Sequence, residues 1–278
     1  MLYYKEKVNM NYNLRNARFL MPNGIEEEQG FHFSKTYSLE KPYEYDPKHV
    51  INEITKIKEC DYLELGVDQG HTFDHIKNVK LKHGIDPFGA SENITHRMTS
   101  QMFFSMNEYF FNNTYDLIFI DAIHLFPVVQ QEIHDSLKIL NDNGLLVLHD
   151  TCPNKESSQK ILYSDFEKIL NDVLCCEEKE RLKWHENTKK NQPVGYNGDV
   201  WKNAAWYRSN TDYTVFSIPD ACISIISKKK MKSFEHKSKI KNLTFEKMTW
   251  GLYYNCFHQI MNPFTFDYFV ENISKELL

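Results

Sequence analysis

The sequence predicts an α/β fold with a mostly parallel sheet, and residues 115–153 give the clearest evidence for it. Two apolar runs, Leu117–Ile120 and Leu145–Leu148, lack the alternation of a half-buried strand, and such runs are typical of strands buried on both faces. Between them, Pro127 opens a stretch with apolar residues at positions 129, 133, 137 and 140, the spacing of one helix face. A strand, a helix and a second strand in this order place the two strands parallel to each other.

Polar residues follow both of these strands. Asp121 and His124 come after the first strand, and His149 and Asp150 come directly after the second. The carboxyl ends of parallel strands meet at one edge of the sheet, where open α/β folds bind their ligands. We therefore expect the four side chains to converge on a functional site. The plainer alternatives are that each acid caps the next helix and that His149 only forms a hydrogen bond beneath the sheet.

A helix and a strand are predicted before this segment. Asp46 and Pro47 have the form of a cap followed by a first-turn proline, opening a helix with apolar residues at 50, 54 and 57. Residues 61–65 then predict a strand that runs through a turn containing Gly66 and Gly70 into a second helix.

Two further strands are predicted before the central segment. Residues 82–85 form a short strand that ends at Asp86. A third strand is predicted over 94–98, followed by Thr99 and Ser100.

The chain after Pro153 is more varied. Residues 154–199 are charged and long, which favours an insertion or lid. Asp199 is then expected to cap a helix over 200–208, and residues 213–218 and 222–227 predict a closing hairpin.

These elements divide the chain into three parts. Residues 1–45 form an N-terminal extension without an assigned structure, and residues 46–232 form the main domain, with 154–199 as its insertion. Residues 233–278 form an amphipathic, helical C-terminal extension.

Composition limits which classes of partner and which cellular location the sequence predicts. A net charge of −5 and a pI near 6.2 give no general attraction for nucleic acid or acidic membranes. The N-terminus has no apolar signal region, no stretch is long enough to span a membrane, and six cysteines lack metal-type spacing. We expect a cytoplasmic protein with reduced thiols that binds neither membranes nor nucleic acid, and a homo-oligomer is compatible with these features.

The first strand and its turn have the form of a nucleotide-binding element. Glu64, Gly66 and Gly70 give the pattern acid-x-Gly-x-x-x-Gly, and glycine allows a tight turn and a close approach to a ligand. Asp86 ends the next strand at the position where an acid accepts hydrogen bonds from ribose hydroxyls. The glycine turn alone would fit an ordinary strand-to-helix connection better than a ligand-binding one.

Four motifs together resemble the class I S-adenosylmethionine-dependent methyltransferases. They are Glu64-x-Gly66-x-x-x-Gly70, Gly84-Ile-Asp86-Pro87, Phe119-Ile-Asp121-x-x-His124 and Leu148-His-Asp150-Thr151. The chain is most similar to the methyltransferase-24 family, whose members include macrolide-sugar O-methyltransferases. The resemblance covers residues 48–152 and implies a Rossmann-like fold with a seven-stranded, mostly parallel sheet and a terminal antiparallel hairpin.

The resemblance also implies how S-adenosylmethionine would be bound. Its methionine end would lie at Glu64, Gly66 and Gly70, and its ribose at Asp86. The adenine would lie near Thr99 and Ser100. Asp121 would also face the cofactor.

In the sugar O-methyltransferases a divalent metal lies at the same sheet edge. The resemblance implies metal ligation by Asp121 and Asp150 and makes His124 the general base. His149 occupies a further ligand position that carries a carboxylate in the metal-dependent relatives. Because imidazole suits Mg²⁺ less well than carboxylate does, the ion is Mg²⁺ or another divalent metal, and metal-free transfer with His124 or His149 as the base is the alternative.

The expected activity is O-methylation of a hydroxyl on a sugar, a glycan precursor or a polyhydroxylated small molecule. One alternative is a non-catalytic subunit that binds S-adenosylmethionine or a glycan. A nicotinamide-dependent oxidoreductase is disfavoured, because Asp68 and Gln69 lengthen the gap between the glycines beyond the Gly-x-Gly-x-x-Gly turn.

Overall fold

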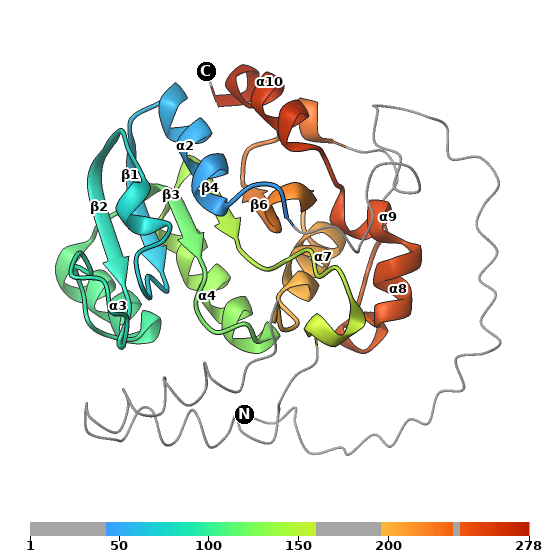
Figure 1. Ribbon diagram of the computed structural model, residues 1–278, viewed down its shortest axis with the longest axis horizontal. Coiled ribbons are helices and arrows are strands. Elements are labelled where there is room, and N and C mark those ends of the chain that lie inside the picture. Colours follow the sequence, from blue (N-terminus) through green and yellow to red (C-terminus); the bar gives the residue numbers. More distant parts are fainter. Residues whose placement is uncertain (1–42, 160–195, 236–239, 278) are drawn as a thin grey trace, which may run out of the picture. The chain divides into compact units, whose positions relative to one another are not determined.

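The computed structural model describes residues 43–159, 196–235 and 240–277, all of which lie in one compact unit spanning residues 31–278. Within these ranges six strands form one sheet in the order β2-β1-β3-β4-β6-β5 (Figure 1). The strands are β1 Cys60–Leu65, β2 Val79–Ile85, β3 Tyr115–Ile120, β4 Leu140–Leu148, β5 Thr214–Ile218 and β6 Ile223–Ser227. β2, β1, β3 and β4 are parallel, and β6 is antiparallel to both of its neighbours.

Helices connect and cover these strands. The α-helices are α2 Pro47–Ile57, α3 Ser100–Met106, α4 Phe126–Ile139, α7 Trp201–Asn210, α8 Trp250–Asn255, α9 Phe257–Met261 and α10 Phe266–Leu277. Shorter helical turns are Phe73–His75, Asn107–Phe111, Glu156–Gln159, Pro219–Ala221, Lys232–Phe234 and Phe245–Lys247. No helix among the described residues is both long enough and apolar enough to cross a membrane.

The sheet is buried on both faces, as the unbroken apolar runs predict. On β3, Ile118 and Ile120 belong to one hydrophobic cluster and Leu117 and Phe119 belong to another. The first cluster includes residues of α3, α4, α7, α8 and α9, whereas the second includes residues of α2 and α10. The strand ends are therefore the part of β3 and β4 that a ligand can reach.

The predicted third strand is wrong, so the described ranges contribute six strands to the sheet rather than the seven expected. Residues 94–98 form a single bridge, from His96 to Ile85. The Thr95 hydroxyl accepts the hydrogen bond from the Gly84 amide at 2.9 Å. Because a side chain takes a partner that a neighbouring strand would need, the ladder does not extend beyond this bridge.

The helix predicted after Gly70 is also wrong. β2 begins at Val79, three residues before its predicted start, and only residues 71–78 separate it from Gly70. That length holds one 3₁₀ turn, Phe73–His75. The other predicted elements are present: the helix capped by Asp46, the central strand-helix-strand, the hairpin of β5 and β6, and the helical C-terminal segment. The insertion prediction falls largely on 160–195, and the N-terminal prediction on 1–42, outside the described residues.

Candidate active site

The strand order places a ligand-binding position between β1 and β3. β2 follows β1 on one side, whereas β3 lies on the other side of β1, and such a reversal of strand order is where open parallel sheets bind ligands. Gly66 follows β1 and Asp121 follows β3. A Cβ atom at Gly66 would lie 2.2 Å from the backbone oxygen of Asp121, and Gly66 has a φ of +88°. Only glycine fits this contact, so the glycine turn and Asp121 meet at the switch point.

Asp86 joins the loops that follow β1 and β2. Its carboxylate accepts hydrogen bonds from the backbone amides of Asp68 at 2.8 Å, Phe88 at 2.7 Å and Gly89 at 2.6 Å. A carboxylate has about four acceptor sites, so one remains beyond these three bonds. Asp86 has a structural role in the fold, and its predicted contact with a ribose remains a prediction.

Glu64 is buried on the face of the sheet that also contains Tyr62. The Tyr62 hydroxyl donates a hydrogen bond to the Glu64 carboxyl. Burial raises the pKa of the Glu64 carboxyl well above its ordinary range. Glu64 thus has a hydrogen-bond partner within the sheet, and its predicted contact with the cofactor remains a prediction.

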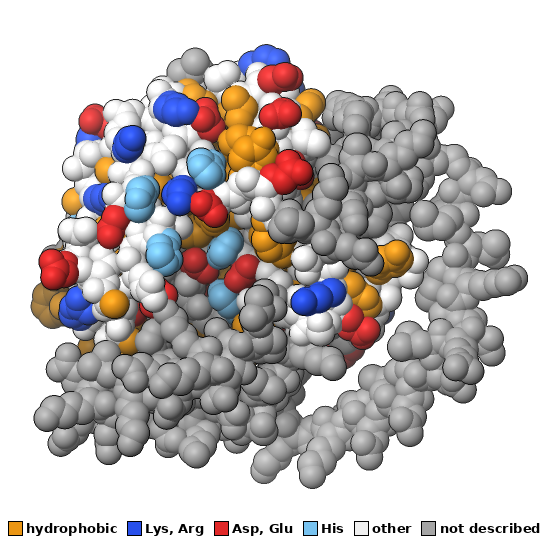
Figure 2. Space-filling view, viewed as in Figure 1, with side chains coloured by type: hydrophobic (Ala, Val, Ile, Leu, Met, Phe, Trp, Pro, Cys, Tyr) orange, Lys and Arg blue, Asp and Glu red, His pale blue; other side chains and the backbone are white. Residues whose placement is uncertain are grey.

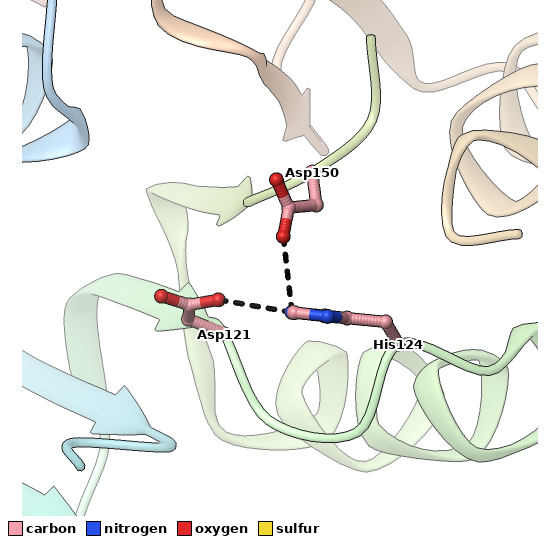
Figure 3. A group of neighbouring side chains, drawn as sticks. All are labelled: Asp121, His124 and Asp150. Atoms are coloured by element: carbon pink, nitrogen blue, oxygen red, sulfur yellow. Dashed lines mark hydrogen bonds and ion pairs between the residues drawn. The ribbon is translucent and has the colours of Figure 1, made fainter. Parts of the chain in front are cut away.

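Asp121, His124 and Asp150 converge at the carboxyl ends of β3 and β4 (Figure 3). The His124 Nε2 atom lies 3.2 Å from Asp121 Oδ1 and 3.2 Å from Asp150 Oδ2. The side chains of Asp121, His124 and Asp150 are 26%, 20% and 12% exposed. The expected convergence of these residues is thus found, and they remain accessible to a ligand. Acidic and histidine side chains gather on this face of the described surface (Figure 2).

His149 lies beside this cluster and contacts one of its carboxylates closely. Its Nδ1 atom is 2.9 Å from Asp121 Oδ1 and 3.8 Å from Asp150 Oδ2. Burial opposes the charged imidazole, but the two carboxylates outweigh it and raise the pKa of His149 to about 10. The same carboxylates raise the pKa of His124, and the two imidazoles hold the pKa of Asp121 well below its ordinary range.

The closest group of possible ligand atoms includes a different histidine from the one in the metal hypothesis, which remains a prediction. The metal hypothesis grouped His149 with the two carboxylates, whereas the atoms that lie within 4.8 Å of one another belong to Asp121, His124 and Asp150. Neighbouring ligands of an octahedral ion held at about 2.1 Å lie about 3 Å apart. The two 3.2 Å separations around His124 Nε2 therefore fit a divalent ion. Two carboxylates with one imidazole suit Mn²⁺ or a similar transition metal better than Mg²⁺.

Sequence reasoning missed Asn197. Its side-chain Nδ2 donates a hydrogen bond to Asp150 Oδ1 at 2.7 Å, and the residue is 2% exposed. The two residues are far apart in the sequence, so no local pattern could have identified the contact. Asp199, predicted to cap its own helix, instead accepts a hydrogen bond from the backbone amide of Phe126 at 2.7 Å, at the start of α4.

Comparison with protein families identifies the domain that contains this site. Residues 63–151 match a family described as a methyltransferase domain, Methyltransf_24. These residues form a methyltransferase domain. The match begins in β1 and ends just after Asp150, so it contains the glycine turn, Asp86 and the acidic cluster, and the resemblance inferred from the motifs is confirmed. A search of curated proteins found no match for the chain.

Solved structures of methyltransferases are also similar to the chain. An O-methyltransferase from Bacillus cereus, in complex with SAH, is 11% identical, with 67% of this chain and 84% of that chain covered and a TM-score of 0.36. The MycE methyltransferase of the mycinamycin biosynthetic pathway, in complex with Mg and SAH, is 12% identical. The similarity covers 75% of this chain and about half, 54%, of that chain, with a TM-score of 0.35. These scores are low, and the methyltransferase assignment rests on the family match and the strand order.

The methyltransferase domain contains a second buried acid, on α4. The Ser100 hydroxyl, at the start of α3, donates to Glu132 Oε1 at 2.7 Å, whereas Glu132 Oε2 has no hydrogen-bond partner among the described residues. The Thr99 hydroxyl accepts from the Met102 amide and caps α3. Thr99 and Ser100 thus both have structural contacts, and their predicted position near the adenine remains a prediction.

Replacing Glu132 by glutamine is expected to stabilise the protein only at higher pH. Burial raises the pKa of Glu132 to about 7 from its ordinary value of 4.5, so the folded state binds a proton that the unfolded state releases between these values. Stability therefore falls as the pH rises through this window. The Glu132→Gln variant should be more stable by about 3 kcal/mol above pH 7.5 and no more stable near pH 4. Urea unfolding at both pH values tests this, and an equal difference at both would contradict it.

Proposed function

We propose that the methyltransferase domain transfers a methyl group from S-adenosylmethionine to a hydroxyl of a sugar, glycan precursor or other polyhydroxylated small molecule, assisted by a divalent ion. The observation that carries the proposal is the convergence of two carboxylates and an imidazole beside the glycine turn, at the switch point of the sheet. A cofactor that supplies a methyl group and a site that activates a hydroxyl would thereby lie next to each other.

The cofactor part of the proposal rests on the loops after β1 and β2. Gly66 has no side chain, so the turn after β1 can lie directly against the backbone of Asp121 at the switch point. The remaining acceptor site of Asp86 would bind a ribose hydroxyl, and Gly70 would border the methionine end of the cofactor. S-adenosylmethionine supplies an electrophilic methyl group on a positively charged sulfur.

The ion part of the proposal assigns Asp121, His124 and Asp150 as ligands. Their oxygen and nitrogen atoms already have the separations of neighbouring ligands. A divalent ion at this position would bind a substrate hydroxyl and lower its pKa. This assignment exchanges the two histidines relative to the sequence hypothesis. His124 Nε2 lies 3.2 Å from both carboxylates, whereas His149 Nδ1 lies 2.9 Å from that of Asp121 and 3.8 Å from that of Asp150.

His149 would then remove the hydroxyl proton. Its Nδ1 atom is held by Asp121, an arrangement that fixes the ring and leaves Nε2 as the basic atom. A pKa of about 10 would keep the ring protonated at neutral pH, but the positive charge of a bound ion lowers the pKa of a nearby imidazole. In the reaction the substrate oxygen forms a bond to the methyl carbon as the carbon–sulfur bond breaks, and the proton moves to His149.

Calorimetric titration with S-adenosylmethionine tests the cofactor part directly. We expect micromolar binding to the full-length protein, followed by formation of S-adenosylhomocysteine when sugars and glycan precursors are screened with Mn²⁺. Absence of cofactor binding would overturn the proposed function. Cofactor binding without turnover on any hydroxyl acceptor would favour the non-catalytic binding subunit.

The Asp86→Ala variant should bind S-adenosylmethionine at least about tenfold more weakly, a loss of roughly 1.4 kcal/mol or more. Removal of the carboxylate eliminates the ribose acceptor and also frees the amides of Asp68, Phe88 and Gly89. The Thr95→Ala variant is a useful control, because it removes another side chain that holds this region through the Gly84 amide. Unchanged affinity in Asp86→Ala would place the ribose elsewhere.

A further inference from the structure

We infer that residues 197–199 set the spacing of the ion site, with Asn197 as a positioning residue for divalent-ion binding. The inference rests on the ion site of the proposed function. Asn197 contacts Asp150 on one side of the cluster. Gly198 and Asp199 contact the backbone of His124 on the other side.

Asn197 fixes the Asp150 side. Its Nδ2 atom donates to Asp150 Oδ1 at 2.7 Å, while Asp150 Oδ2 lies 3.2 Å from His124 Nε2. The two carboxylate oxygens thus have separate partners, and the hydrogen bond from Asn197 determines which oxygen faces the ion site. Asp150 also has a φ of +55°, a left-handed conformation that a non-glycine residue adopts only with support from its surroundings.

The two residues after Asn197 fix the His124 side. A Cβ atom at Gly198 would lie 1.8 Å from the backbone oxygen of His124, so the two backbones are in direct contact. The Asp199 amide donates to the same oxygen at 3.3 Å, and the Asp199 carboxylate accepts from the amide of Phe126 at 2.7 Å. The loop from β3 to α4 is therefore held by the segment that also holds Asp150.

The chemistry of Asn197 suits a positioning role. An amide donor can hydrogen-bond the carboxyl group of Asp150 without adding a charge that would repel a cation. Asn197 Oδ1 is buried and has no hydrogen-bond partner among the described residues, an arrangement that costs about 1–3 kcal/mol. The Nδ2 atom of Asn197 is thus hydrogen-bonded to Asp150, while its Oδ1 atom lacks a partner among the described residues. This is expected if the contact with Asp150 positions a ligand of the ion.

The Asn197→Ala variant should bind Mn²⁺ roughly 10–100-fold more weakly than the wild-type protein, the usual effect of removing a hydrogen bond to a metal ligand. Its affinity for S-adenosylmethionine should stay within about twofold, because Asn197 contacts neither Gly66 nor Asp86. Titration of the full-length protein with Mn²⁺, followed by electron paramagnetic resonance of the free ion, gives the first affinity. Calorimetry gives the second.

Two further variants separate positioning from folding. Asn197→Ser leaves a smaller cavity, but its shorter side chain cannot reach Asp150 as asparagine does, so Mn²⁺ binding should still weaken. Asn262→Ala removes another buried asparagine, which donates to the backbone oxygens of Val215 and Phe234. Its Oδ1 also has no partner within the described part of the chain. This control should lose stability and keep its Mn²⁺ affinity.

Unchanged Mn²⁺ affinity in both Asn197 variants would overturn the inference while leaving the proposed function intact. An equal loss of Mn²⁺ affinity in Asn262→Ala would also overturn it, since general destabilisation would then explain the effect. A wild-type protein that binds S-adenosylmethionine but not Mn²⁺ would remove the ion from the proposed function and this inference with it.

Discussion

We expect the Asp121→Asn variant to bind Mn²⁺ at least about 100-fold more weakly and to lose nearly all methyl transfer. Asp121 Oδ1 contacts both His124 and His149, so this one oxygen links the proposed ion site to the proposed base. Asparagine has nearly the same shape but lacks the negative charge, which removes the attraction for the ion. The pKa of His149, about 10 beside the two carboxylates, should also fall toward its ordinary value.

Three measurements on full-length protein test this prediction: Mn²⁺ titration, formation of S-adenosylhomocysteine with an accepted substrate, and the NMR titration of His149. Asp116→Asn is a matched control on β3, the strand that Asp121 follows. Asp116 lies near the start of β3, where it contacts Lys58 and Asn141 away from the cluster. Full Mn²⁺ binding and turnover in Asp121→Asn would show that the reaction does not use this carboxylate.

The Gly66→Ala variant should either fail to fold or lose S-adenosylmethionine binding. Its added methyl group would lie 2.2 Å from the backbone oxygen of Asp121 and 2.7 Å from the Cα of Ala122. Both are backbone atoms that cannot rotate away, and the φ of +88° adds further strain for alanine. The expected destabilisation is several kcal/mol, within the range of overpacked core substitutions and left-handed strain combined.

Thermal unfolding and cofactor titration measure the two consequences of Gly66→Ala. Gly251→Ala is the control, since its Cβ would approach nothing closer than the Thr249 hydroxyl at 3.9 Å. Gly251 lies within α8, and alanine at a helical position without a clash is expected to stabilise by about 0.5–1 kcal/mol. A Gly66→Ala protein with wild-type stability and cofactor affinity would contradict the contact at the switch point.

The fold was predictable where a single local signal determines an element. The unbroken apolar runs of β3 and β4 and the proline at the start of α4 identify the central strand-helix-strand correctly. The errors lie after β1 and at residues 94–98. After β1 the structure depends on where β2 begins, and at residues 94–98 it depends on the hydrogen bond from the Gly84 amide to the Thr95 side chain. The spacing of apolar residues in the sequence indicates neither of these features.

The candidate site was predictable as far as topology determines it. Parallel strands bring Asp121 and Asp150 to the same edge wherever their side chains point, so their convergence follows from the strand order. The roles of His124 and His149 depend on side-chain directions within a few ångströms, which spacing does not determine. Asn197 reaches Asp150 only because the chain returns to the site after β4, a long-range contact that leaves no local pattern.

The contact between Gly66 and Asp121 also has a thermodynamic consequence. A glycine loop proposed to bind the cofactor and a carboxylate proposed to bind the ion share one backbone contact, so a displacement on either side is transmitted to the other. Two binding events connected in this way have a coupling free energy, and such coupling is reciprocal. The factor by which Mn²⁺ changes the dissociation constant of S-adenosylmethionine must therefore equal the factor by which S-adenosylmethionine changes that of Mn²⁺.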